Sequence, residues 1–248
     1  MIILIAIATF VATLVGGLFA LRFRDKLHLI LGFSAGAVIA VAFFDLIPEA
    51  LDLGWKFYTA GTTMAMVAVG FFLYLILDRL IFLHAHTHEE GHEHDLSSTE
   101  SHGIRRGMLG AGSLSLHSFL DGVAIGLAFQ VSPAVGAIVT AAVLTHDFSD
   151  GINTVNLILK NKGNKTRAFH WLLTDAFAPV LGAASTLLFT LPENVLSAIL
   201  ALFAGFFLYI GATDLIPESH HAHPKFLTTF MTLLGAGALY VAIHFAGV

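Results

Sequence analysis

The hydrophobic residues of this chain are grouped in eight long segments that are separated by short, more polar connections. A helix needs about 20 apolar residues to cross the hydrocarbon core of a bilayer, and each segment has about that length. The segments are residues 2–21, 29–51, 61–83, 105–130, 134–159, 169–190, 194–217 and 225–246. The pattern predicts an all-α integral membrane protein with eight transmembrane helices, in which residues 1–248 form a single transmembrane domain.

The composition agrees with a membrane protein and limits which atoms could bind a metal. Hydrophobic residues make up 56% of the 248 residues and charged residues 12%, against about 25% charged in a soluble domain. The first segment carries no small-residue cleavage site and is predicted to be a retained helix. The chain has no cysteine, so any metal must be bound by nitrogen and oxygen.

The basic residues predict how the helices are oriented. Eleven of the twelve lysines and arginines fall near the connections between segments 1 and 2, 3 and 4, 5 and 6, and 7 and 8, and only Lys56 falls on the other side. Lysine and arginine near helix ends are retained in the cytoplasm. We therefore expect a multi-pass protein of the inner cell membrane with both termini outside the cytoplasm.

Two short motifs each occur twice. DLIPE is found at residues 45–49 and 214–218, and His-x-Phe-x-Asp-Gly is found in HSFLDG at 117–122 and in HDFSDG at 146–151. In the eight-helix arrangement the two copies of each motif lie on antiparallel helices, as in transporters built from inverted repeats. Either pair alone has chance similarity as an alternative, but two pairs nested about one centre favour a repeat.

The histidine–aspartate pairs point to metal binding. Positions i and i+4 share a helix face, so His117 with Asp121 and His146 with Asp150 each direct a nitrogen and a carboxylate to one point. A carboxylate inside the bilayer costs several kcal/mol unless it is paired, and no lysine or arginine lies near the middle of a span. A mixed imidazole and carboxylate set suits Zn²⁺, Fe²⁺ and Mn²⁺. The alternative is that these are buried polar residues holding helices together.

A second ion is predicted beside the first. Ser118 and Asp147 each follow one of the histidines and offer oxygens to an ion bridged by the two aspartates. Asp175, in the sixth segment, would complete this second site.

These residues together resemble the ZIP (Zrt/Irt-like) family of divalent-metal transporters. HSFLDG is similar to the family's fourth-helix motif, HDFSD to its fifth-helix motif, FFLYIGATDLIPE at 206–218 to its seventh-helix signature, and DLIPEA at 45–50 to its second-helix one. The resemblance implies a 3+2+3 bundle of inverted repeats, a homodimer, and a binuclear centre between the fourth and fifth helices. The implied ligands are His117, Asp121, His146 and Asp150 for the first ion and Ser118, Asp121, Asp147 and Asp150 for the second.

This chain departs from the family pattern at Ser118, where the family usually has asparagine. A hydroxyl is the poorer ligand, so the second ion is expected to be held more weakly. Asp175 is matched only by its position in the sixth helix, because no motif fixes the spacing there.

The acidic residues of the DLIPE motifs are predicted to line the transport path. Asp45 and Glu49 would lie on the outer route, and Asp214 and Glu218 on the inner one. Their prolines are expected to break the local helix and free backbone carbonyls, which is tolerated only where the backbone faces protein or water. For Glu49 and Glu218 the alternative is a place at a helix end in interfacial water.

Two histidine-rich tracts lie in connections placed in the cytoplasm. The first belongs to a loop at about 84–104, of which residues 86–103 are expected to be disordered; the second is HHAH at 220–223. Both are typical of weak, exchangeable metal sites, with dispensable linkers as the alternative. The histidines concerned are His84, His86, His88, His92, His94, His220, His221 and His223.

Two functions from different classes fit a buried metal centre. The favoured one is a secondary transporter, not an enzyme, that moves a divalent metal into the cytoplasm, with Zn²⁺ as the substrate and Fe²⁺, Mn²⁺, Co²⁺ or Cd²⁺ as alternatives. The other is an intramembrane metal-dependent hydrolase, but the chain has no His-Glu-x-x-His motif. The expected partners are metal ions, the lipid bilayer and a second copy of the chain, with no nucleic acid.

Overall fold

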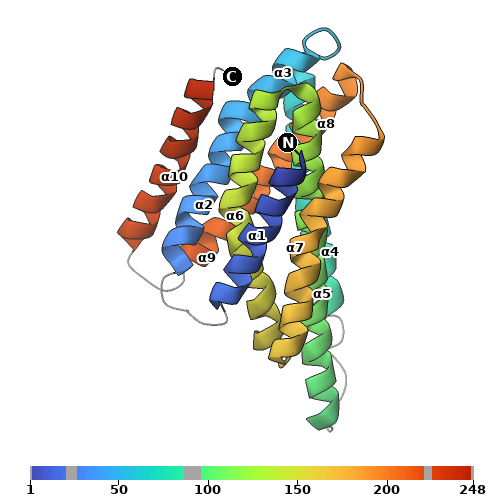
Figure 1. Cartoon of the computed structure of the whole chain (residues 1–248), viewed down its shortest axis with the longest axis vertical. Helices are drawn as coiled ribbons and strands as arrows, with labels where there is room; N and C mark the ends of the chain where they lie inside the picture. The colour runs from blue at the N-terminus through green and yellow to red at the C-terminus, as the bar shows by residue number, and fades with distance from the viewer. Residues whose placement is uncertain (1, 21–26, 87–95, 221–224, 247–248) are drawn as a thin grey trace.

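The computed structural model describes residues 2–20, 27–86, 96–220 and 225–246, and every regular element within these ranges is a helix (Figure 1). The helices are α1 Ile2–Ala20, α2 Leu27–Val41, η1 Ala42–Leu46, α3 Ile47–Gly54, α4 Ala60–His86, α5 Leu96–Val131, α6 Pro133–Lys160, α7 Lys165–Ser185, η2 Thr186–Leu188, α8 Glu193–Tyr209, η3 Ile210–Leu215, α9 Ile216–His220 and α10 Lys225–Ala246. Five short elements each continue, without a break, the helix that precedes them in the chain; these are η1, α3, η2, η3 and α9.

The eight predicted segments correspond to eight helical rods. The second rod joins α2, η1 and α3, the sixth joins α7 and η2, and the seventh joins α8, η3 and α9. Within the described residues, six rods are long and apolar enough to cross a membrane, and α1 is a shorter apolar helix. The remaining helix, α6, has 28 residues and carries the polar residues 146, 147 and 150. The prediction of an all-α membrane protein with eight helices is confirmed.

The connection between α4 and α5 differs from the prediction. α4 extends to His86 and α5 begins at Leu96, well before residue 105. The expectation of disorder at residues 86–103 is therefore wrong for residue 86 and for residues 96–103. Polar composition marks where a chain leaves the bilayer, but residues 96–106 contain no proline and so continue the helix beyond that point. Residues 87–95, with three of the tract's histidines, lie outside the described part of the chain.

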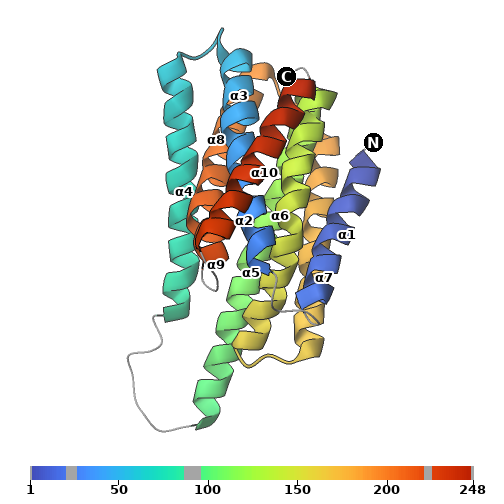
Figure 2. The ribbon, with the colours of Figure 1, turned by 90° about the vertical axis from the view of Figure 1, so that its left-hand side faces the viewer.

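The helices form two groups that pack side by side (Figure 2). One group consists of α1, α5, α6 and α7, and the other of α2, α3, α4, α8, α9 and α10. Packing of α2 against α6 is the most extensive contact between them. A core of buried Ala, Val, Leu, Ile and Phe side chains fills the junction, and it includes Val139 and Val143 of α6 as well as Val38 and Phe207 of the second group.

Both DLIPE motifs contain a π-helical turn. In η1 the backbone N–H of Ile47 donates to the carbonyl of Ala42, and in η3 that of Ile216 donates to the carbonyl of Gly211. Pro48 and Pro217 follow directly; proline has no N–H and its ring crowds the carbonyl four residues before it. The helix is thus widened at each proline and not broken as predicted. Figure 1 shows α3 at the upper end of the molecule and α9 about half-way down it, beside the lower ends of α2 and α10.

Glycines mark the closest contacts between helices. A Cβ on Gly16 of α1 would collide with the backbone of Phe148 in α6, and a Cβ on Gly151 of α6 would collide with the backbone of Thr13 in α1. Three further pairs show the same reciprocal contact. They are Gly122 of α5 with Gly182 of α7, Gly36 of α2 with Gly235 of α10, and Gly70 of α4 with Gly205 of α8.

These four glycine pairs are related to one another. Exchanging α1 with α7, α2 with α8, α4 with α10 and α5 with α6 converts each pair into another of the four. The same exchange converts η1 into η3. This correspondence is what an inverted repeat of three helices, a central pair and three helices predicts.

Candidate metal centre

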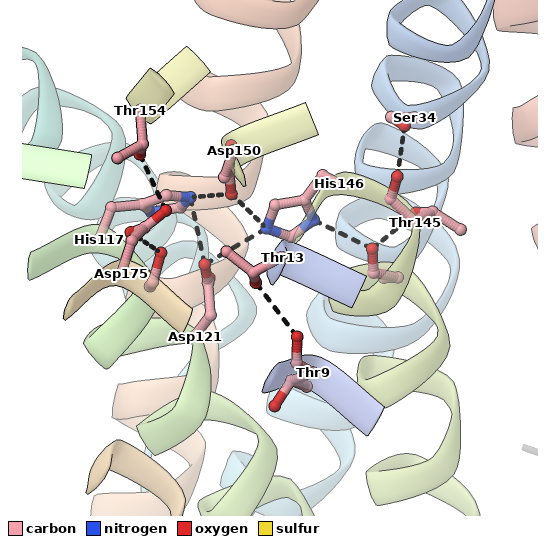
Figure 3. A network of polar contacts seen from close by, with 12 residues as sticks. Thr9, Thr13, Ser34, His117, Asp121, Thr145, His146, Asp150, Thr154 and Asp175 are labelled. Carbon is pink, nitrogen blue, oxygen red and sulfur yellow. Dashed lines mark hydrogen bonds and ion pairs between the residues drawn. The ribbon is translucent and has the colours of Figure 1, made fainter. Parts of the chain in front are cut away.

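Four side chains from α5 and α6 converge on one point inside the bundle (Figure 3). They are His117, Asp121, His146 and Asp150, and one ligand atom from each lies within 4.8 Å of all the others. Oδ2 of Asp121 is 3.1 Å from Nε2 of His117 and 3.3 Å from Nε2 of His146. Oδ2 of Asp150 is 3.6 Å and 3.9 Å from the same two nitrogens. All four residues are buried.

These separations suit one metal ion. In a tetrahedral zinc site with bonds of about 2.0–2.2 Å, neighbouring ligand atoms lie roughly 3.3–3.6 Å apart. The four histidine–carboxylate distances, from 3.1 to 3.9 Å, bracket that spacing. Nε2 of His117 is buried without a hydrogen-bond partner. The group therefore offers two nitrogens and two oxygens to a cation of zinc's size.

The glycine in each His-x-Phe-x-Asp-Gly motif has a packing role. Gly122 lies where α7 passes, with the carbonyl of Pro179 in the position a Cβ would take. Gly151 lies in the same way against the carbonyl of Thr13 in α1. Each motif thus combines two ligands on one helix face with a glycine that allows a third helix to pack closely. The close packing of α7 and α1 at these glycines encloses the centre.

The orientation of His146 is set by its own helix. Its Nδ1 lies 3.0 Å from the carbonyl oxygen of Ala142. A metal-ligating histidine commonly donates its second ring N–H to such an oxygen, and this fixes both the ring and the tautomer. Nε2 of His146 is then left to face the carboxylates of Asp121 and Asp150.

Asp175 lies beside the four-residue cluster and is not a member of it. Oγ of Ser118 donates to its Oδ1 and Oγ1 of Thr154 donates to its Oδ2, each at 2.9 Å, and all three residues are fully buried. Asp147 is also buried, with both carboxylate oxygens lacking a hydrogen-bond partner. Thr154 was not singled out from the sequence, although it follows Asp150 by four residues and so lies on the same helix face.

The acidic residues of the DLIPE motifs belong to other helices than the cluster, which lies on α5 and α6. Asp45 is buried in η1, and neither of its carboxylate oxygens has a hydrogen-bond partner. Glu49 is half-buried in α3. Asp214 belongs to η3 and Glu218 to α9. Asp45 is therefore the most deeply enclosed of those whose side chains the structure describes.

The histidine-rich tracts lie mostly outside the described residues. His84 and His86 belong to the last turn of α4 and His220 to the end of α9. His88, His92, His94, His221 and His223 fall in the ranges that are not described. The predicted weak metal sites in these tracts remain predictions.

Comparison with known proteins gives full-length relatives. The chain is 25% identical to "Zinc transporter ZupT" of Corynebacterium aurimucosum over 94% of this chain and 92% of that protein. It is 24% identical to "Zinc transporter ZupT" of Enterobacter sp. (strain 638) over 95% of this chain and 91% of that protein. Human "Zinc transporter ZIP6" is 33% identical over 107 residues, which are 43% of this chain and 14% of that much longer protein.

A family model also matches the chain. The model is described as "ZIP Zinc transporter" and matches residues 83–242, which include both histidine–aspartate motifs and the second DLIPE motif. The match covers well over half of the chain. The buried His/Asp cluster, the eight helices and these relatives agree in indicating divalent-metal transport, and the chain belongs to the ZIP zinc transporter family.

Proposed function

We propose that this protein carries Zn²⁺ across the membrane through the cluster of His117, Asp121, His146 and Asp150. The observation that carries the proposal is the convergence of these four side chains, all buried, within 4.8 Å. The donor set of two imidazoles and two carboxylates suits zinc. The full-length relatives are named as zinc transporters.

The cluster suits transport because its ligands form a buried site inside the helix bundle. Carboxylates inside a membrane are costly without a partner, and a bound cation supplies that partner. Asp45, buried in η1, offers an oxygen site on one side of the cluster, and we assign Asp214 in η3 the corresponding role on the other. An ion would pass from one acidic residue through the cluster to the next.

We further propose that transport is directed into the cytoplasm and that both termini lie outside it. The turn between α6 and α7 and the helix ends beside it carry four basic residues, Lys160, Lys162, Lys165 and Arg167. This turn and the end of α4 both lie in the lower half of the molecule (Figure 2). Basic residues near helix ends favour the cytoplasmic side. Both termini lie toward the other end (Figure 1). The protein would act as a homodimer in the inner cell membrane.

Metal uptake into sealed proteoliposomes tests the proposal. Purified protein is reconstituted and presented separately with Zn²⁺, Fe²⁺, Mn²⁺, Co²⁺ and Cd²⁺, and the metal inside the vesicles is measured over time. We expect saturable uptake with Zn²⁺ preferred, and none in vesicles containing the His117→Ala, His146→Ala double variant. Equal uptake by that variant and the unmodified protein would overturn the role of the cluster. Saturable uptake of another metal in preference to Zn²⁺ would overturn the choice of substrate.

A further inference from the structure

Both imidazole rings of the metal cluster lie against aromatic rings of the neighbouring helix group. The ring centroids of His117 and Tyr74 of α4 are 5.9 Å apart, with planes at 86°. Those of His146 and Phe207 of α8 are 6.0 Å apart, with planes at 76°. Edge-to-face pairs with this spacing are favourable beyond the area they bury. Helices α4 and α8 therefore contribute rings to the centre, whereas α5 and α6 contribute the ligands.

The two histidines differ in what else orients them. The bond between Nδ1 of His146 and the carbonyl of Ala142 fixes the ring of His146 without help from another helix. Nε2 of His117 lies 3.1 Å from Oδ2 of Asp121 but makes no hydrogen bond, and the neighbour placed edge-to-face against its ring is Tyr74. The rotation of the His117 ring therefore depends on packing more than that of His146.

Tyr74 is itself held firmly by other rings. Its ring lies 5.5 Å from that of Phe206 and 5.3 Å from that of Tyr209, both in α8. Tyr209 in turn lies 5.4 Å from Phe71 of α4 and is buried. These four rings tie α4 to α8 and leave Tyr74 little freedom to move away from His117.

We propose that Tyr74 is a positioning residue for metal binding, whose ring holds the imidazole of His117 with Nε2 directed at Asp121 and Asp150. The proposal rests on the proposed role of the four-residue cluster. A ligand that is already oriented loses less conformational freedom when the ion binds, so affinity rises without any new bond to the metal. We assign this role to the ring of Tyr74, because the edge-to-face pair joins the ring to His117.

Zinc uptake kinetics test the proposal with a matched set of variants. Tyr74→Leu removes the ring, Tyr74→Phe keeps it, and Phe72→Leu removes a ring from the same helix that is 58% exposed. We expect Tyr74→Leu to raise KM by roughly 3- to 10-fold, the range that one aromatic pair corresponds to in affinity. Tyr74→Phe and Phe72→Leu should stay within about twofold of the unmodified protein, since neither loses that ring pair. KM is the readout because it does not depend on how much protein reaches the membrane.

A second measurement covers the case in which Tyr74→Leu does not fold. Co²⁺ titration of the purified Tyr74→Met variant, followed by the visible absorption of the bound ion, reports affinity without transport. An unchanged KM in Tyr74→Leu, an unchanged Co²⁺ affinity in Tyr74→Met, or an equal loss in Tyr74→Phe would each overturn the positioning role. The His117→Ala variant separates the two proposals. If this variant transports zinc normally, the assignment of the cluster fails. If it is inactive while Tyr74→Leu is normal, only the role of Tyr74 fails.

Discussion

The imidazole rings of His117 and His146 lie with centroids 5.6 Å apart and planes tilted by 30°, although the two residues belong to different helices. Helices α5 and α6 are joined at one end through Ser132, which caps α6 by accepting a hydrogen bond from the N–H of Val135. They therefore run antiparallel, and the aspartate one turn after each histidine is directed to the same centre. The two motifs form one site, so neither is expected to function alone.

Loss of either histidine should therefore abolish transport. We expect His117→Ala or His146→Ala to lower zinc uptake by roughly 100-fold or more, since even residues that only support a ligand cost about 10- to 100-fold. The variants should still reach the membrane, because a buried polar residue is replaced by an apolar one. Uptake is measured in vesicles together with the amount of protein present. His170→Ala is the control, since His170 is an exposed histidine of α7; wild-type uptake in both cluster variants would contradict the assignment.

Ser118 and Thr154 should be equivalent in their effects. Each donates one hydrogen bond to Asp175, so Ser118→Ala and Thr154→Val each leave one oxygen of a buried carboxylate without its donor, at a cost of about 1–3 kcal/mol of stability. We expect a similar lowering of the unfolding midpoint in both variants and a loss of uptake far smaller than that caused by Asp150→Ala. If Ser118→Ala abolished uptake as fully as Asp150→Ala while Thr154→Val did not, Ser118 would be a full metal ligand.

Much of the fold and of the four-residue cluster could be predicted from the sequence because both follow from short-range rules. The length of an apolar segment determines whether it can span a bilayer. The i and i+4 spacing determines that His117 and Asp121 share a helix face. Pairing of the two motifs followed from the antiparallel order of adjacent helices, which an eight-span arrangement requires.

The features that sequence reasoning missed depend on contacts between distant segments. Tyr74 looks like any other aromatic residue of an apolar helix until α4 is packed against α5. Thr154 is important because it donates a hydrogen bond to Asp175, which belongs to a different helix, α7. The π-helical turns depend on how the chain accommodates Pro48 and Pro217 within a packed rod, which the proline alone does not determine. The early start of α5 at Leu96 cannot be predicted from polar composition, which marks where the chain leaves the bilayer and not where the helix begins.

Asp45 should contribute to transport and not to stability. Its carboxylate is buried and both oxygens lack hydrogen-bond partners, which is unfavourable for an ionised group unless a cation visits it. We expect Asp45→Asn to reduce zinc uptake several-fold, with an unfolding midpoint that is unchanged or higher. Uptake and thermal unfolding of the same preparations provide the check. Asp52→Asn, at an exposed position of α3, is the control; equal uptake by the two variants would contradict a place for Asp45 on the path.

The glycine pairs allow a test of the inverted repeat through stability. Gly36 of α2 and Gly205 of α8 correspond under the exchange of helices, and a Cβ on either would collide with a backbone carbonyl, that of Thr232 or of Val67. Gly36→Ala and Gly205→Ala should each destabilise the purified protein by about 1–3 kcal/mol. Gly237 of α10 has nothing within 4 Å of its Cβ position, so Gly237→Ala should be neutral or stabilising by up to about 1 kcal/mol, since alanine is the better helix former.

The unfolding midpoints of these three variants decide between a repeated and an unrepeated packing. Backbone atoms cannot rotate away from an added methyl group as a flexible side chain can, so the collision must be relieved by separating two helices. If the two halves are built alike, separating α2 from α10 and separating α8 from α4 should cost similar amounts. A large loss at Gly36 with none at Gly205 would show that the two contacts are not equivalent, and a loss at Gly237 as large as at Gly36 would show that the effect is not due to close helix contact.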